Sequence, residues 1–144
     1  MHAATSLLLA LVVALVVALA GCSRVDTGTM DLGRRLDAER VEVEDRTATF
    51  RAGEPLAFAL FLTGAPGPTE LTLLLLQVPA DDPTGPALER WRDDVVISIR
   101  DFRRSRAGLD LPDLTAGLEP GAYRLEVRRG DLVLAEGHFS IVPP

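Results

Sequence analysis

Hydrophobic residues form one long run near the start of the chain and a series of shorter runs after it. Leu7 to Ala20 is an unbroken stretch of 14 apolar residues. A helix that spans a bilayer needs about 20 residues, whereas the apolar core of a signal peptide needs roughly 7 to 15. We therefore expect residues 1–21 to form a signal-peptide helix.

The shorter runs are separated by Gly, Pro and Asp, which is typical of strands joined by turns. Leu56 to Leu62 places a large apolar side chain at every second position, which is the period of a β-strand. Leu71 to Val78 is nearly all apolar and predicts a central strand that is buried on both faces.

The last third of the chain has the clearest pattern. Its alternation predicts a strand with one buried and one wet face. The buried face is formed by Tyr123, Leu125 and Val127. The wet face is formed by Arg124, Glu126 and Arg128. Gly130-Asp131 follows and suits a two-residue hairpin turn. Leu132 to Val142 then returns as the second strand, with Gly137 as the expected position of a bulge.

Residues 87–106 carry two competing periods. The spacing of Leu88, Trp91, Val95, Ile99 and Phe102 is helical, whereas Val95, Ile97 and Ile99 alternate as in a strand. The β-branched cluster at Val95 to Ile97 favours a strand. A short helix over Ala87 to Arg92 remains an open alternative for the start of this segment.

About seven short strands in a segment of about 115 residues predict an all-β sandwich. That length suits one domain with a single core. We expect the domain to cover residues 30–144, with residues 22–29 as a short tether before it.

The sequence Leu19-Ala20-Gly21-Cys22 resembles the lipobox of bacterial lipoproteins, in which a Leu and two small residues precede the cysteine. The resemblance implies a diacylglyceryl group on the sulfur of Cys22, cleavage before Cys22, and acylation (typically palmitate) of the new amino group. Two or more acyl chains are needed for stable anchoring. Met1 to Ser6 lacks the Lys or Arg typical of such leaders, and an ordinary secretory signal is the alternative.

The resemblance implies a membrane location in the cell envelope. Ser23 follows the cysteine, which is compatible with the periplasmic face of the outer membrane in a Gram-negative cell. In other bacteria the expected site is the outer face of the cytoplasmic membrane. The tether from Ser23 to Thr29 spans at most about 25 Å, so the domain is expected to lie close to the lipid.

A second resemblance involves the run Leu118-Glu119-Pro120-Gly121-Ala122-Tyr123. It is similar to the sequence that enters the penultimate strand of fibronectin type III and immunoglobulin-like domains. There the tyrosine hydroxyl bonds back to the upstream backbone as a tyrosine corner. A wider skeleton looks like that of small bacterial envelope proteins with an immunoglobulin-like domain, and comprises Leu32-Gly33, Asp37, Phe50, Gly53, Gly64, Gly130 and Phe139. That family implies a fold and a location but no reaction.

The charge of the chain is acidic, with 21 Asp and Glu against 15 basic residues and a net charge of -6. Nucleic acid is therefore not an expected partner, because binding phosphates requires a basic face. The densest basic run, Arg100 to Arg106, is interrupted by Asp101 and is interpreted as a solvated edge or loop, with contact to anionic lipid or polymer as the alternative. Cys22 is the only cysteine, which excludes an intramolecular disulfide.

Residues for catalysis are scarce in the expected mature chain, and we do not expect an enzyme. His138 is its only histidine, its serines lack a G-x-S-x-G context, and the thiol of Cys22 is consumed by lipid. One histidine and no free cysteine do not make an ordinary zinc site. We expect no metal and no cofactor, and we interpret Asp81-Asp82 and Asp93-Asp94 as solvated acids.

The sequence favours a structural or protein-interaction module with an unidentified envelope protein as its partner. The alternative is a module that binds an extended glycan or peptide at a sheet edge or loop end. Trp91 and Phe102 are the candidate interaction residues, because tryptophan often dominates interfaces. For Trp91 the sequence favours a place in the sandwich core, because Leu88 and Val95 are apolar neighbours at helical or strand spacing.

Overall fold

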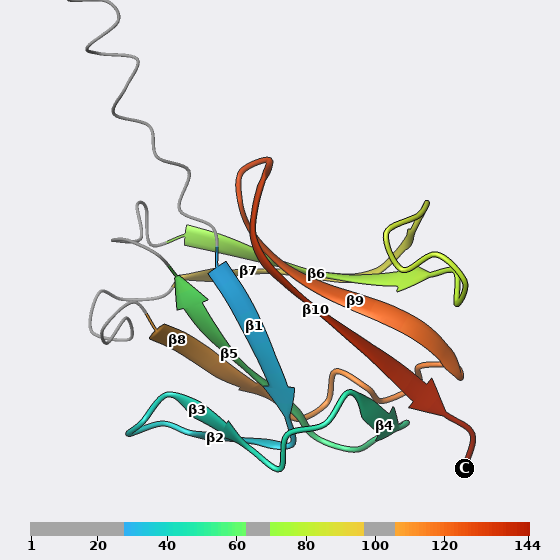
Figure 1. Ribbon diagram of the computed structural model, residues 1–144, viewed down its shortest axis with the longest axis horizontal. Coiled ribbons are helices and arrows are strands. Elements are labelled where there is room, and N and C mark those ends of the chain that lie inside the picture. The colour runs from blue at the N-terminus through green and yellow to red at the C-terminus, as the bar shows by residue number, and fades with distance from the viewer. Residues whose placement is uncertain (1–27, 63–69, 97–105) are drawn as a thin grey trace, which may run out of the picture.

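The computed structural model describes residues 28–62, 70–96 and 106–144 and forms strands without helices in these ranges (Figure 1). The strands are β1 (Gly28–Gly33), β2 (Arg35–Asp37), β3 (Glu42–Glu44), β4 (Thr49–Arg51), β5 (Leu56–Leu62), β6 (Glu70–Val78), β7 (Leu88–Val96), β8 (Arg106–Leu111), β9 (Gly121–Arg129) and β10 (Leu132–Val142). The signal-peptide helix expected over residues 1–21 lies outside the described residues. In the described ranges no helix is long and apolar enough to cross a bilayer.

Two sheets pack face to face around one core. One has the strand order β1-β5-β8 and the other β4-β10-β9-β6-β7, while β2 and β3 form a separate hairpin. In the letters used for immunoglobulin domains, β1, β5 and β8 correspond to A, B and E. The second sheet contains G, F, C and C′ as β10, β9, β6 and β7. The all-β, immunoglobulin-like sandwich expected from the sequence is confirmed.

The chain changes sheets between its first and fourth strands. β1 pairs antiparallel with β5, whereas β4 pairs parallel with the end of β10. Between them the β2–β3 hairpin covers the outer face of β5, where Val43 and Leu36 pack on Ala57 and Ala59. The small alanines allow this close approach.

The core lies between the two sheets and includes large side chains from both. Phe50, Tyr123 and Phe139 form an aromatic group, with Phe139 edge-on to Phe50 and stacked on Tyr123 at 5.6 Å between ring centroids in each pair. Aliphatic residues from β5, β6 and β9 complete the cluster. Such aromatic pairs are worth about 0.5–1.5 kcal/mol beyond the area that they bury.

The prediction that Leu71 to Val78 is buried on both faces is confirmed. Leu73 and Leu75 lie in the main core. Leu74, Leu76 and Val78 point to the other face of the sheet and are buried there as well. β6 is flanked by β9 and β7, so it is an interior strand, as expected.

The predicted hairpin is confirmed, but its bulge lies elsewhere. Arg129 pairs with Leu132 across Gly130, which has a φ of 59° and so suits the turn. The register shifts between Val133 and Ala135, whereas Gly137 pairs regularly with Leu125. Gly137 instead permits close packing, because a β-carbon there would lie 2.8 Å from the sulfur of Met30.

The ambiguous segment is a strand where the structure describes it. β7 pairs with β6 along its whole length, including Trp91 with Leu75, so the helix considered over Ala87 to Arg92 is wrong. The pairing with β6 provides hydrogen-bond partners for the backbone N–H and C=O groups of β7, which in a helix would bond to one another. Trp91 and Val95 pack against the core from this edge strand. Ile97 to Ser105 lies outside the described residues.

Thr115 joins two loops at the end of the sandwich where β1 ends. It is fully buried in the connection from β8 to β9. Its hydroxyl donates a hydrogen bond to the carbonyl of Glu54 at 2.6 Å and accepts one from the backbone amide of Gly53 at 3.0 Å. The hydroxyl therefore fixes the loop before β5 against the loop before β9.

Candidate functional site

Tyr123 lies at the start of β9 with only 1% of its surface exposed. Its hydroxyl donates a hydrogen bond to the backbone carbonyl of Glu119 at 2.7 Å. Pro120 and Gly121 make the bend between the two groups, and Leu118 packs against the core beside them. Burial raises the pKa of Tyr123 above its ordinary value, because the phenolate loses hydration there.

Arg90 of β7 faces this corner. Its Nε donates a hydrogen bond to Oε1 of Gln77 at 2.8 Å, and its Nη2 lies 3.8 Å from a carboxylate oxygen of Glu119. The positive charge of Arg90 partly opposes the rise in the pKa of Tyr123. These contacts hold the corner in place, and the phenolic O–H donates a hydrogen bond to the backbone carbonyl of Glu119.

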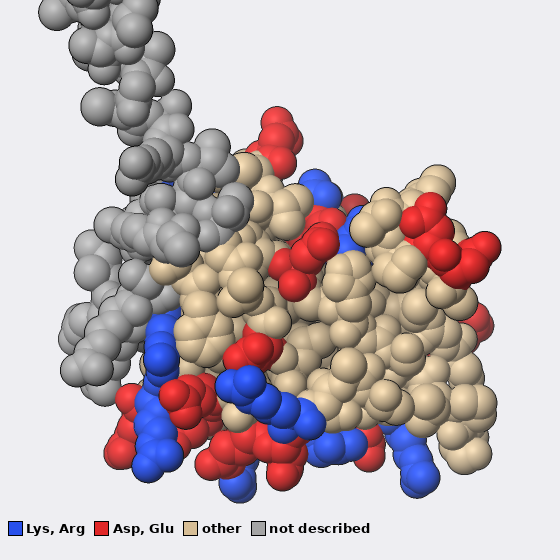
Figure 2. Space-filling model, in the orientation of Figure 1, with Lys and Arg blue, Asp and Glu red and all other residues tan. Residues whose placement is uncertain are grey.

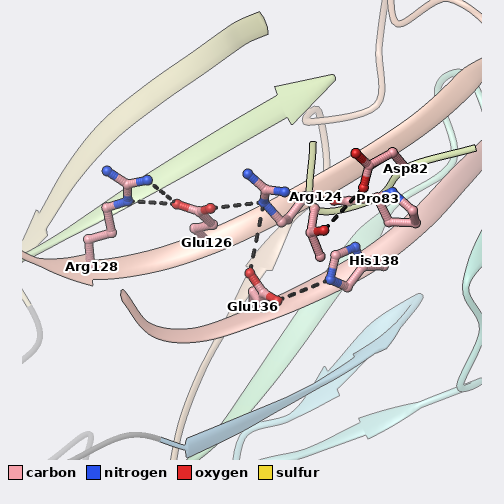
Figure 3. Close-up of polar contacts among 8 residues, drawn as sticks. Asp82, Pro83, Arg124, Glu126, Arg128, Glu136 and His138 are labelled. Atoms are coloured by element: carbon pink, nitrogen blue, oxygen red, sulfur yellow. Dashed lines mark hydrogen bonds and ion pairs between the residues drawn. The ribbon is translucent and has the colours of Figure 1, made fainter. Parts of the chain in front are cut away.

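A chain of ion pairs occupies the outer face of the five-stranded sheet (Figure 3). We call it the outer charge network, formed by Arg124, Glu126, Arg128, Glu136 and His138. Glu126 accepts hydrogen bonds from Arg124 at 2.8 Å and from Arg128 at 2.6 Å. Arg124 also lies 3.8 Å from Glu136, whose other oxygen contacts His138 at 3.3 Å.

Glu126 is only 3% exposed, so the wet face predicted for β9 is wrong at this position. Its neighbour on β6 is Leu74, which is also buried and which pairs with Arg92 on its other side. Long arginine stems cover apolar surface while their charged heads reach water. The nearly all-apolar run of β6 is the sign in the sequence that the outer face of the sheet is covered by long side chains.

Arg124 connects the network to the loop between β6 and β7. Its Nη1 donates a hydrogen bond to the carbonyl of Pro83 at 2.7 Å (Figure 3). Within that loop the Asp82 carboxylate accepts from the Thr84 hydroxyl at 3.1 Å, and its carbonyl accepts from the Gly85 amide at 3.0 Å. The loop is therefore fixed both internally and to the sheet.

The same face continues onto β7 with further paired charges. Arg92 makes two parallel hydrogen bonds to Glu89 at 3.0 and 3.1 Å, a bidentate geometry that is stronger than a single contact. These bonds lower the pKa of Glu89 below its ordinary value. Asp94 accepts a hydrogen bond from Thr72 at 2.8 Å.

These geometries place fixed charges on a rigid sheet. In residues 28–62, 70–96 and 106–144 no group of three His, Cys, Asp or Glu side chains is arranged to hold a metal ion. His138 is partly exposed, and its side-chain partner is the carboxylate of Glu136.

The other candidate residues from the sequence are placed only in part. Trp91 is half-buried against the core and does not form an exposed aromatic anchor. Phe102 lies outside the described residues, as do Leu19, Ala20, Gly21 and Cys22. The large apolar side chains most exposed in the described ranges are instead Leu88, at 59%, and Val96, at 74%.

Shallow hollows lie on the surface of the described part of the chain. One, of about 350 Å³, lies between β1, the loop before β4, and β10, beside Gly137 and His138. Another, of about 440 Å³, lies between the start of β6 and the end of β7, where Leu71, Val95 and Val96 line it with Glu70 and Asp94. Charged side chains of both signs interleave along the lower edge of Figure 2, where β2 and β3 lie.

The strands and their order in the two sheets define an all-β protein with an immunoglobulin-like sandwich. Among solved structures it is similar to an immunoglobulin-like protein from Pseudomonas aeruginosa, with 21% sequence identity and a TM-score of 0.54. The match covers 85% of this chain and 100% of that chain. No protein-family model matches the sequence, and no curated protein matches it. At this identity the similarity concerns the fold alone.

Proposed function

We propose that the chain is a lipid-anchored protein of the bacterial cell envelope whose domain is a non-enzymatic structural or interaction module. The observation that carries the proposal is the position of Cys22. It follows Leu19-Ala20-Gly21 directly and precedes the first strand, at Gly28, by six residues. Diacylglycerol on the sulfur and a fatty acid on the amino group provide the several chains that stable anchoring requires.

The outer face of the five-stranded sheet is the proposed contact surface for an envelope protein partner. Its charges are already held by one another, as in the bidentate pair of Arg92 and Glu89. A partner with complementary charges therefore meets side chains that need little further ordering. The anchor places this module at the periplasmic face of the outer membrane in a Gram-negative cell, or outside the cytoplasmic membrane otherwise.

The anchor is tested by expressing the full chain in a bacterium and measuring the mass of its N-terminal peptide. The expected peptide begins at Cys22 and carries the mass of three acyl chains. Cys22→Ser is expected to abolish both the processing and the membrane association, whereas the matched control Ser23→Ala keeps both. An unmodified Cys22, or a mature chain that begins elsewhere, refutes the anchor.

The contact surface is tested by photo-crosslinking in intact cells. A crosslinker in place of Arg92 lies on the outer face of the sheet, and one in place of Arg35 lies on the β2–β3 hairpin as the control. The proposal expects one discrete adduct from position 92 and none from position 35. Absence of a discrete adduct from position 92 counts against the module.

A second candidate function is the binding of an extended glycan or peptide at the edge of β7. β7 is the last strand of its sheet in the described residues, and it carries the exposed Leu88 and Val96. A ligand strand at such an edge gains main-chain hydrogen bonds. Binding to peptide or glycan arrays that disappears in the Leu88→Asp and Val96→Asp variants favours this candidate, and unchanged binding excludes it.

A further inference from the structure

A short stretch of chain joins the two sheets at one side of the sandwich. β1 and β10 run in the same direction there, one in each sheet, and the chain crosses between their ends on its way into β4 (Figure 1). The backbone amide of Thr47 donates a hydrogen bond to the carbonyl of Leu32 at 3.2 Å, and the carbonyl of Ala48 accepts one from the amide of Ser140 at 2.9 Å. We call Thr47-Ala48 the bridge, because its two residues join the edge of one sheet to the edge of the other.

The bridge covers only one end of these two edges. β4 pairs only with residues 140–142 of β10, and β1 pairs only with β5 in the described residues. Residues two apart in a strand direct their main-chain groups to the same side. His138 therefore directs its amide and carbonyl to the same side as Ser140, and Met30 to the same side as Leu32. Within the described ranges no backbone hydrogen bond reaches His138 or Met30 on that side.

A hollow of about 350 Å³ lies directly beyond the bridge, between the two open edges. Each residue that lines it belongs to the described part of the chain. The lining comprises Met30, Asp31 and Leu32 of β1, Arg46, Thr47 and Ala48 at the bridge, and Gly137 and His138 of β10. The open main-chain groups of both sheets thus border one hollow, and its closed end shows how an extended backbone bonds both edges.

The charged side chains around this hollow are paired with one another. Arg46 and Asp31 form an ion pair at 3.0 Å on one rim. His138 contacts Glu136 at 3.3 Å on the other rim. The groups left to bind a ligand are therefore main-chain amides and carbonyls, which favours an uncharged partner.

The two open edges of the five-stranded sheet differ in charge. Five of the nine residues of β7 are charged, and charged side chains on an edge strand oppose pairing with another strand. From Leu132 to Phe139, before β4 begins to cover it, β10 carries one carboxylate, Glu136, and one histidine, His138. The edge of β10 is therefore the better site for strand addition. Another extended backbone matches the spacing of its amides and carbonyls.

We propose that an extended, uncharged segment of a partner polypeptide adds as a strand at this side of the sandwich, in line with β4. Its main chain bonds His138 on one side and Met30 on the other, in the way that the bridge bonds both edges. Alternate side chains of the segment face the apolar floor at Leu32 and Gly137, so small or apolar residues suit those positions. The site lies beside the outer face of the sheet and does not depend on the lipid anchor.

The main-chain contact is tested by selecting a phage-displayed library of random short peptides against the purified protein. A selected peptide is synthesised, and its affinity is measured by fluorescence anisotropy. His138→Pro removes the amide that faces the segment, and proline is tolerated where the N–H of an edge strand is unpaired. The affinity should fall about tenfold, which corresponds to one main-chain hydrogen bond. The control His138→Ala keeps the amide and should keep the affinity.

A second pair of variants tests the hollow without changing the edge. Ala48 lines the hollow, whereas the exposed Thr49 next to it does not. Ala48→Trp fills the hollow and should abolish binding, and Thr49→Trp should leave it unchanged. This pair decides the question if urea unfolding shows that His138→Pro disturbs the fold.

Hydrogen exchange followed by NMR locates the bound peptide. The amides of Met30 and His138 should exchange slowly only when the peptide is bound, whereas the amide of Gly137, which faces β9, exchanges slowly throughout. Three outcomes overturn the proposal. These are a library that yields no binding peptide, an affinity that is equal in the two variants of each pair, and protection that appears along β7 instead.

Discussion

The hydroxyl of Tyr123 donates a hydrogen bond to the backbone carbonyl of Glu119, 2.7 Å away and four residues earlier in the chain. The bond closes the turn before β9, and the ring of Tyr123 stacks on Phe139 of β10. One side chain thus fixes the entry to β9 and joins it to the neighbouring strand. The turn and the packing of the second sheet are therefore coupled.

Tyr123→Phe is expected to keep the stacked ring and lose the hydrogen bond. The carbonyl of Glu119 then loses this partner, and the free energy of unfolding should fall by about 0.5–1.5 kcal/mol. Urea unfolding followed by tryptophan fluorescence measures the change. Phe139→Leu is the control that removes the stacking and keeps the hydroxyl. A Tyr123→Phe variant as stable as the parent shows that the bond contributes nothing net.

Glu54 makes the stability of the domain sensitive to acid. A hydrogen bond from the backbone amide of Arg51 lowers the pKa of Glu54 below its ordinary value of 4.5, and Arg34 adds to the effect. A carboxyl with a lowered pKa in the folded state stabilises it above the unfolded pKa, and this stabilisation is lost as the pH falls through the folded pKa. Glu54→Gln should therefore be less stable than the parent at pH 7.

The difference between the parent and Glu54→Gln should shrink as the pH falls from about 5 toward 3, where the parent carboxyl becomes protonated. Urea midpoints at each pH measure this difference. A gap of constant size across that range contradicts the assignment to the carboxyl charge of Glu54.

Glu126 is expected to matter far more than an exposed carboxyl of the same network. Glu126→Gln leaves the guanidinium groups of Arg124 and Arg128 without their shared charge partner. Loss of a buried, charge-assisted bond of this kind costs about 1–3 kcal/mol. Glu136→Gln is the matched control, because its carboxylate is partly exposed and such pairs are worth about 0–1 kcal/mol. Equal effects of the two substitutions on the urea midpoint would show that burial of Glu126 is unimportant.

Gly108 permits the β2–β3 hairpin to lie on the outer face of the first sheet. A β-carbon at Gly108 would lie 2.7 Å from the carbonyl oxygen of Phe58 and 2.7 Å from the Cδ1 of Leu36. Gly108→Ala should therefore destabilise the domain by about 1–3 kcal/mol, the usual cost of overpacking. At Gly137 the nearest atoms belong to the mobile side chain of Met30 and to Leu32, so Gly137→Ala should cost less. The reverse order in thermal unfolding would contradict this explanation.

The elements that could be predicted from the sequence are those specified by local patterns. The β9–β10 hairpin has a strict alternation and a turn pair at Gly130-Asp131, and the motif before Tyr123 occupies six consecutive residues. By contrast β2, β3 and β4 have three residues each, too few to show a period. The described residues form ten strands, against about seven expected, and these short strands contribute to the difference.

Features that depend on distant neighbours could not be predicted. Glu126 is buried because its strand lies between β6 and β10 and because Arg124 and Arg128 hold its carboxylate, whereas the alternation around Glu126 predicts a wet face. The bulge was assigned to Gly137 because glycine favours irregular backbone, but that glycine serves the approach of Met30 from the other sheet. The sequence of Leu88 to Val96 fits both a helical and a strand period, and the pairing with β6 decides in favour of the strand.

The pairing of β1 has a mechanical consequence for a chain held at its amino end. β1 forms six consecutive antiparallel pairs with β5, from Gly28 opposite Leu62 to Gly33 opposite Ala57. A force that draws the preceding chain outward along the strand axis acts on all these pairs at once, in shear. Peeling would break them one at a time and need far less force. A pull on the preceding chain along the strand axis therefore acts in the direction in which the first strand resists extraction best.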